Sequence, residues 1–105
     1  MSNIDMSEYE QRQLALMRDF LIDYTARRIS LKRLLDGLEG LLLCVPNLPP
    51  DWRTEFHEHW LSLEQARAVA LDRGDDVSVF TTEIEADIAA LKILVAKQLD
   101  APPER

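Results

Sequence analysis

Residue types that usually support catalysis or metal binding are scarce in this 105-residue sequence, which contains one cysteine, two histidines and three glycines. The single cysteine, Cys44, cannot form a disulfide within the chain. His57 and His59 are two residues apart on a predicted helix and point to different sides, whereas a zinc-protease helix needs histidines four apart. None of the glycines lies in a Gly-rich turn, so no phosphate-binding loop is present.

Paired carboxylates are the remaining option for a metal centre. Di-metal helical bundles use a Glu-x-x-His step on each of two helices, but the residue three after Glu55 is another glutamate. Glu39 and Glu64 lie beside apolar stripes, and we interpret both as solvated flank residues. We therefore predict no catalytic residue, no cofactor and no metal site. The protein is not expected to be an enzyme, since an enzyme would need a cofactor that the sequence does not indicate.

Long apolar runs and a targeting segment are also lacking. The longest unbroken apolar run spans residues 41–45, far short of the roughly 20 residues that cross a bilayer. Residues 1–11 show no charged region, apolar region and cleavage site of a secretory signal. With its single thiol, the chain is predicted to be cytoplasmic and not to enter a membrane.

Basic residues are outnumbered by acids, 12 to 19, which gives a formal net charge of −7 at pH 7. Residues 51–105 hold twelve acids and six bases, whereas residues 1–50 hold seven and six. A negative field disfavours nucleic acid, whose affinity depends on Lys and Arg that neutralise phosphates. The same field would attract a basic partner, although excess acid also simply keeps a small protein soluble.

Apolar residues recur at helical spacing in four segments, and no strand-like alternation of useful length occurs. We predict helices at about residues 7–27, 30–45, 51–73 and 82–99, with flexible tails at 1–6 and 100–105. Short connections between amphipathic helices imply an all-α, antiparallel four-helix bundle of one domain. The predicted core stripes are Leu14, Met17, Leu21 and Tyr24, with Leu16 and Phe20 beside them; Leu31, Leu34, Leu35, Leu38, Leu41, Leu42 and Val45; Trp52, Phe56, Trp60, Leu63, Ala66 and Ala70; and Ile84, Ile88, Leu91, Val95 and Leu99.

Capping residues mark where the predicted helices begin and end. Gly74 should end the third helix, and the pair Arg27-Arg28 closes the first, where cations favour the negative end of the helix dipole. The predicted N-terminal signals are Ser7 with Glu10, then Ser30, then Pro50 or Asp51, and finally Thr81 or Thr82, with Thr82 and Glu85 at capping-box spacing.

Three small residues of the second predicted helix need an explanation. Gly37 and Gly40 each cost about 1 kcal/mol of helix propensity relative to alanine. We expect a neighbouring helix to approach closely there in compensation. Cys44 lies beside the leucine stripe with no adjacent histidine or lysine, so a buried, inert thiol is predicted.

An acidic cluster surrounds the third predicted connection, where six acids and one base, Arg73, fall within sixteen residues. The helix dipole accounts for carboxylates in the first turns of the fourth helix, but not for Asp75 and Asp76. We therefore predict that the cluster binds a partner by docking on a cationic groove. This acidic edge consists of Asp72, Asp75, Asp76, Glu83, Glu85 and Asp87.

Three segments carry a resemblance to a known group of proteins: Met17-Arg18-Asp19-Phe20-Leu21, Ile29-Ser30-Leu31 and Trp60-Leu61-Ser62-Leu63-Glu64. The chain resembles small bacterial immunity proteins of toxin–immunity systems, including those of the colicin D and contact-dependent growth inhibition types. The similarity covers most of residues 14–99. It implies a helical bundle whose acidic surface neutralises a cognate toxin, often a nuclease, by occupying its positively charged substrate site.

The leading hypothesis is therefore an immunity-type protein whose acidic edge plugs the basic active-site cleft of a cognate toxin, with no nucleic acid or membrane as partner. The alternative is a non-enzymatic regulatory or structural module that forms a homodimer through apolar residues, for example an exposed part of the leucine stripe. Salt separates the two hypotheses. A charge-driven complex loses on-rate as ionic strength rises, whereas an apolar dimer does not weaken.

Overall fold

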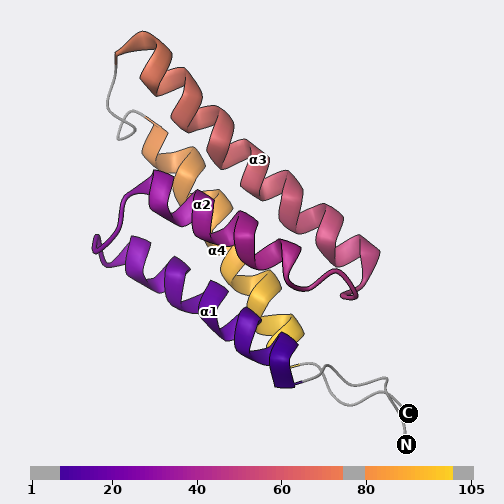
Figure 1. Ribbon diagram of the computed structural model, residues 1–105. Helices are drawn as coiled ribbons and strands as arrows, with labels where there is room; N and C mark the ends of the chain where they lie inside the picture. Colours follow the sequence, from indigo (N-terminus) through magenta and orange to yellow (C-terminus); the bar gives the residue numbers. More distant parts are fainter. Residues whose placement is uncertain (1–7, 75–79, 101–105) are drawn as a thin grey trace, which may run out of the picture.

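The computed structural model describes residues 8–74 and 80–100, and that part of the chain forms four helices (Figure 1). They are α1 (Glu8–Thr25), α2 (Leu31–Leu43), α3 (Pro50–Arg73) and α4 (Thr81–Leu99). Contacts join α1 to α2 and α4, and α3 to the same two helices. Successive helices run in opposite directions, as Figure 1 shows. The predicted all-α four-helix bundle is confirmed.

Local sequence signals set two helix boundaries as predicted. Ser30 is the N-cap of α2, and its hydroxyl accepts a hydrogen bond from the backbone N–H of Arg33 at 3.1 Å. Gly74 ends α3 in the left-handed conformation, with φ of 75°, where the lack of a Cβ removes the steric cost. The predicted cap at Ser7 lies outside the described residues.

The start of α4 corrects a prediction. The helix begins at Thr81 with Phe80 as its N-cap and has no side-chain capping bond, so the predicted threonine cap is wrong. Phe80 packs, partly buried, against the core. Burial of this ring fixes where α4 starts, and such a contact outweighs the contribution of a capping hydroxyl, which is worth about 1 kcal/mol.

The end of α1 also differs from the prediction, because the helix stops at Thr25 and not at residue 27. The N–H of Arg28 donates to the carbonyl of Asp23 at 2.8 Å, and that of Arg27 donates to Tyr24 at 3.0 Å. This pair of bonds is a Schellman motif, in which glycine usually takes the left-handed position. Here Arg27 takes it, with φ of 64°.

One apolar face from each helix builds the core. Most of the predicted stripe residues are buried, and Leu94 joins them although the predicted stripe omitted it. Leu16 was predicted to lie in the core but is 45% exposed. The buried face of α1 is therefore narrower than the predicted stripe with Leu16 and Phe20 beside it. The fully buried large side chains are Leu14, Met17, Leu21, Leu34, Leu35, Leu38, Val45, Phe56, Leu63, Leu91 and Val95.

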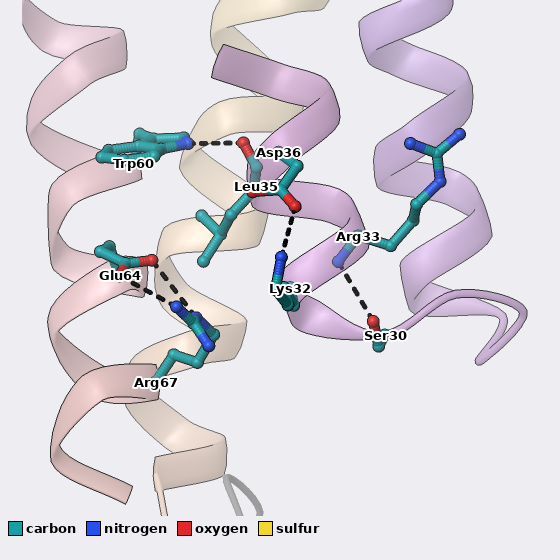
Figure 2. A network of polar contacts seen from close by, with 8 residues as sticks. All are labelled: Ser30, Lys32, Arg33, Leu35, Asp36, Trp60, Glu64 and Arg67. Carbon is teal, nitrogen blue, oxygen red and sulfur yellow. Dashed lines mark hydrogen bonds and ion pairs between the residues drawn. The ribbon is translucent and has the colours of Figure 1, made fainter. Parts of the chain in front are cut away.

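The two tryptophans of α3 tie it to both neighbouring helices. The indole N–H of Trp52 donates to the carbonyl of Leu94 on α4 at 2.9 Å. The indole N–H of Trp60 donates to the carbonyl of Leu35 on α2, also at 2.9 Å (Figure 2). Trp52 is buried and Trp60 is half-buried. The prediction that this aromatic stripe belongs to the core is confirmed.

Charged side chains line the outside of the α2–α3 contact (Figure 2). Lys32 pairs with Asp36 at 2.8 Å, and this bond is the main cause that lowers the pKa of Asp36. Arg67 pairs with the partly buried Glu64 at 3.2 Å and lowers the pKa of Asp36 further from across the seam. Glu64 is thus a partly buried interfacial acid paired within its own helix, and not the solvated flank residue that was predicted. Glu39 is exposed as predicted.

A cationic side chain donates hydrogen bonds to the carbonyl groups at the end of α2. The guanidinium of Arg53 on α3 donates to the carbonyls of Leu42 and Val45, which lie at the negative end of the helix dipole. Cys44 is the C-cap residue and is only partly buried, not fully buried as predicted. The expected close approach at the helix glycines is confirmed for Gly37 and wrong for Gly40.

Candidate functional site

The described members of the acidic edge lie on the last turn of α3 and the first two turns of α4, at the same end of the bundle (Figure 1). Asp75 and Asp76 lie outside the described residues. Asp72, in the last turn of α3, is exposed, and so are Glu83 and Glu85 on α4. Asp87 differs from these three, because only 14% of its side chain is exposed.

The α4 members of the edge do not share one face. Glu83 and Glu85 are two residues apart, so their side chains point to nearly opposite flanks of the helix. Glu85 faces α1, where its charge acts on Tyr24. Asp87 faces α3, and Glu83, four residues before it, lies on the same flank. The edge is therefore divided between the two sides of α4, and its role in binding a partner stays a prediction.

Asp87 forms a polar clamp between α3 and α4. Its carboxylate accepts a hydrogen bond from the hydroxyl of Ser62 at 2.6 Å and lies 2.9 Å from Nδ1 of His59. His59 and Ser62 are three residues apart on α3, so both reach the same point on α4. Because this carboxylate already has two partners, Asp87 contributes to helix packing more than to an exposed acidic surface.

These three residue types also occur in serine hydrolases, but their connections here are different. In a hydrolase triad the serine hydroxyl bonds to the histidine, which in turn bonds to the aspartate. Here the hydroxyl of Ser62 donates to Asp87 directly and not to His59, so the histidine is not placed as the base for the serine. His57 is exposed and stacks on Trp60 with ring centroids 5.7 Å apart. The arrangement therefore explains how α3 and α4 are held together.

A second feature of this end is a groove of ≈ 700 Å³ between the end of α1 and the first three turns of α4. Its floor includes Ile84 and Ile88, which are 4% and 6% exposed. Tyr24 lines it beside Glu85. Burial raises the pKa of Tyr24, and the negative charge of Glu85 raises it further, so the phenol keeps its proton at neutral pH.

Two cations border the groove, Arg27 after the end of α1 and Lys92 on α4. Neither side chain forms an ion pair or a hydrogen bond with another residue that the structure describes. The neighbouring Arg28, in contrast, pairs with Asp23 at 3.0 Å. Sequence patterns do not reveal this groove, because its floor belongs to the core stripe of α4 and Arg27 resembles an ordinary helix-end cation.

Among residues 8–74 and 80–100, no group of three His, Cys, Asp or Glu side chains is placed to hold a metal ion. No helix in the same described ranges is long and apolar enough to cross a membrane. Comparisons of the chain with models of protein families, with curated proteins and with solved structures found no match.

Proposed function

We propose that the protein is an immunity-type inhibitor that acts in the bacterial cytoplasm. It binds a cognate toxin, a nuclease, and neutralises it by docking acidic side chains on the basic active-site cleft. One observation supports this proposal most directly: the last turn of α3 exposes an acid, Asp72, next to a large apolar side chain, Leu71, which is 71% exposed.

An apolar side chain beside charges has the composition of a protein-binding surface. Full burial of a leucine side chain contributes about 1.5–3 kcal/mol, and a few such anchors carry most of the binding energy of an interface. Exposed acids around the anchor raise the association rate with a basic partner and disfavour acidic ones. Asp72 meets this description, and Glu83 is exposed on the flank of α4 that faces α3. Asp87 is bonded to α3, and Glu85 faces the opposite flank of α4.

The proposal is tested with a charge-reversed variant that carries Asp75→Lys, Asp76→Lys and Glu83→Lys. A matched control carries Glu8→Lys, Asp19→Lys and Glu39→Lys, which change the net charge equally at exposed positions on α1 and α2. Each protein serves as bait in a native bacterial lysate at low and moderate salt. We expect the unmodified chain and the control to capture one basic protein, and the edge variant to lose it.

The captured protein is then tested for the proposed activity. Its expression alone should arrest bacterial growth and degrade nucleic acid, and co-expression of the unmodified chain should restore growth. Equal capture by the edge variant would show that another face binds. A captured protein that is harmless when expressed alone would contradict the immunity function.

A second candidate function, self-association, is favoured by the outer face of α4. Ile93 is 61% exposed there, and Ala86, Ala89 and Ala96 are exposed on the same side. These four residues follow intervals of three, four and three, which is the spacing of a helix-pairing seam. In this candidate the chain is a regulatory or structural module that forms a homodimer through α4.

Sedimentation equilibrium distinguishes this candidate from the first. An apolar dimer should persist at high salt, because its contacts are not screened, and Ile93→Glu should convert it to a monomer. Leu43→Glu is the matched control, since Leu43 is 72% exposed on α2. A monomer mass for the unmodified chain at the highest concentration tested would rule out the homodimer.

A further inference from the structure

We propose that the groove between α1 and α4 binds a small amphipathic anion: a carboxylate head on an unbranched apolar chain. This site is separate from the surface proposed for a toxin and does not depend on that function.

The dimensions and the lining suit a small ligand. Pockets that bind small molecules enclose about 300–1,000 Å³ and combine an apolar lining with a few polar groups, and this groove has ≈ 700 Å³. Ile29, Ile84 and Ile88 supply the apolar surface. The distance from Ile84 to Lys92 along the helix axis is about 12 Å, which matches an extended chain of about ten carbons.

The charges at the border select an anion. The protein carries −7 overall, yet the groove has two cations, Arg27 and Lys92, against one acid, Glu85. Neither cation has a side-chain partner within the described part of the chain. An unpaired, partly buried lysine beside apolar surface gains from a carboxylate that replaces part of its hydration. A cationic ligand would gain nothing at either position.

Glu85 determines which end of the groove holds the carboxylate head of the ligand. Lys92 is seven residues after Glu85 on the same helix, about 10 Å away along the axis. A carboxylate at Lys92 therefore avoids most of the repulsion from Glu85, while its chain lies over Ile88 and Ile84. Tyr24 lies beside Glu85, so a phenol and an acid border the chain in this half of the groove, and Lys92 is the cation that pairs with the carboxylate head.

The conformation of Arg27 is an independent indication. Arg27 has φ of 64° at a position where glycine has no steric cost. Strained residues of this kind are concentrated at binding sites, where the side chain has a use that compensates for the strain. Here the strain places a second cation at the border of the groove.

The probe is decanoate, added to the purified full chain below its micelle-forming concentration, with binding measured by isothermal titration calorimetry. Decyltrimethylammonium is the matched cationic probe. Lys92→Gln is compared with Lys97→Gln, an exposed lysine of the same helix that does not line the groove. Glu85→Gln is compared with Glu83→Gln, on the opposite flank. Ala89→Trp narrows the groove, and thermal unfolding checks that each variant is folded.

We expect saturable binding of decanoate and none of decyltrimethylammonium. Lys92→Gln should weaken decanoate binding about threefold to tenfold, as for other partly exposed charge pairs, and Ala89→Trp should abolish it. Glu85→Gln should tighten binding about twofold, because it removes a like charge. Lys97→Gln and Glu83→Gln should leave the affinity unchanged.

Three outcomes would overturn the proposal: no saturable decanoate binding, equal binding of the cationic probe, or equal effects of Lys92→Gln and Lys97→Gln. The effect of Glu85→Gln on binding distinguishes this site from the toxin surface. Glu85→Gln should strengthen decanoate binding and leave capture of a basic protein partner unchanged, because Glu85 faces the flank of α4 opposite to the toxin surface. Either proposal can therefore fail while the other stands.

Discussion

The ring of Phe20 on α1 fills the space that a side chain at Gly37 on α2 would need. A Cβ built at Gly37 would lie 2.6 Å from the Cε1 and Cζ atoms of that ring. The guanidinium of Arg33 lies over the same ring, 5.0 Å from its centroid, which adds a cation–π contact. The glycine thus lets α1 and α2 approach, and the cation helps to hold the ring in place.

Gly37→Ala and Gly40→Ala should consequently change stability in opposite directions. Alanine at Gly40 meets no atom within 4 Å, so its better helix propensity should stabilise the protein by about 1 kcal/mol. Alanine at Gly37 gains the same propensity but displaces Phe20, and overpacking of this kind costs about 1–3 kcal/mol. Urea unfolding of the two variants measures the difference. Equal stabilisation by both would show that the ring moves without cost.

The contacts of Asp87 with His59 and Ser62 predict that its side chain stabilises the folded protein. Asp87→Ala leaves the partly buried His59 and Ser62 without their acceptor, which should lower the free energy of unfolding by about 1–2 kcal/mol. Glu83→Ala is the control, because Glu83 is exposed on the same flank and should change stability by less than about 0.5 kcal/mol. Chemical denaturation compares them. Similar unfolding midpoints would mean that Asp87 is not a clamp.

Replacement of Arg27 should increase stability. Arg27→Gly removes the steric strain that a Cβ causes in the left-handed conformation. After the entropy that glycine adds to the unfolded chain is subtracted, the free energy of unfolding should rise by about 1 kcal/mol. Ala26→Gly, one residue earlier, has no positive φ to relieve and should give no gain. The measurement is again the urea midpoint. A lower midpoint for Arg27→Gly would show that its side chain stabilises the free protein.

Tyr24 should make stability decline at alkaline pH. Its folded-state pKa is raised above the ordinary 10.0 by burial and then by Glu85. A raised pKa favours the protonated phenol in the folded state, so its contribution is complete below about pH 10 and is lost as pH rises through the raised pKa. Tyr24→Phe should reduce the alkaline loss of stability, measured by urea unfolding across this pH range. An unchanged pH profile would contradict the assigned cause.

Charge neutralisation separates the two causes of that shift. The chain has two tyrosines, so in a Tyr9→Phe background the ultraviolet absorbance of tyrosinate reports Tyr24 alone. Glu85→Gln should then lower the pKa of Tyr24, and Glu83→Gln should not, because Glu83 lies on the other flank of α4. A shift of the same size in both would indicate a general charge effect and not a local contact.

The sequence patterns predicted most of the fold and little of the candidate sites. Helical spacing and residues such as Ser30 and Gly74 act within one or two turns of the chain, so they can be read without knowledge of the neighbours. Proximity in the sequence likewise placed Glu83, Glu85 and Asp87 in one acidic edge. Only the packing of α4 between α1 and α3 shows that these acids are divided between two flanks.

By itself, the sequence determined the class of fold, because alternation of apolar and polar residues at 3.6-residue spacing fixes which elements form and which faces are buried. It also determined the excess of negative charge in the second half. The tertiary structure decided which polar groups meet across helices. It brought Asp87 to Ser62, pressed Phe20 onto Gly37 and opened a groove between Tyr24 and Lys92. Such contacts depend on the rotation and depth of each packed helix, and periodicity along a single helix does not set either one.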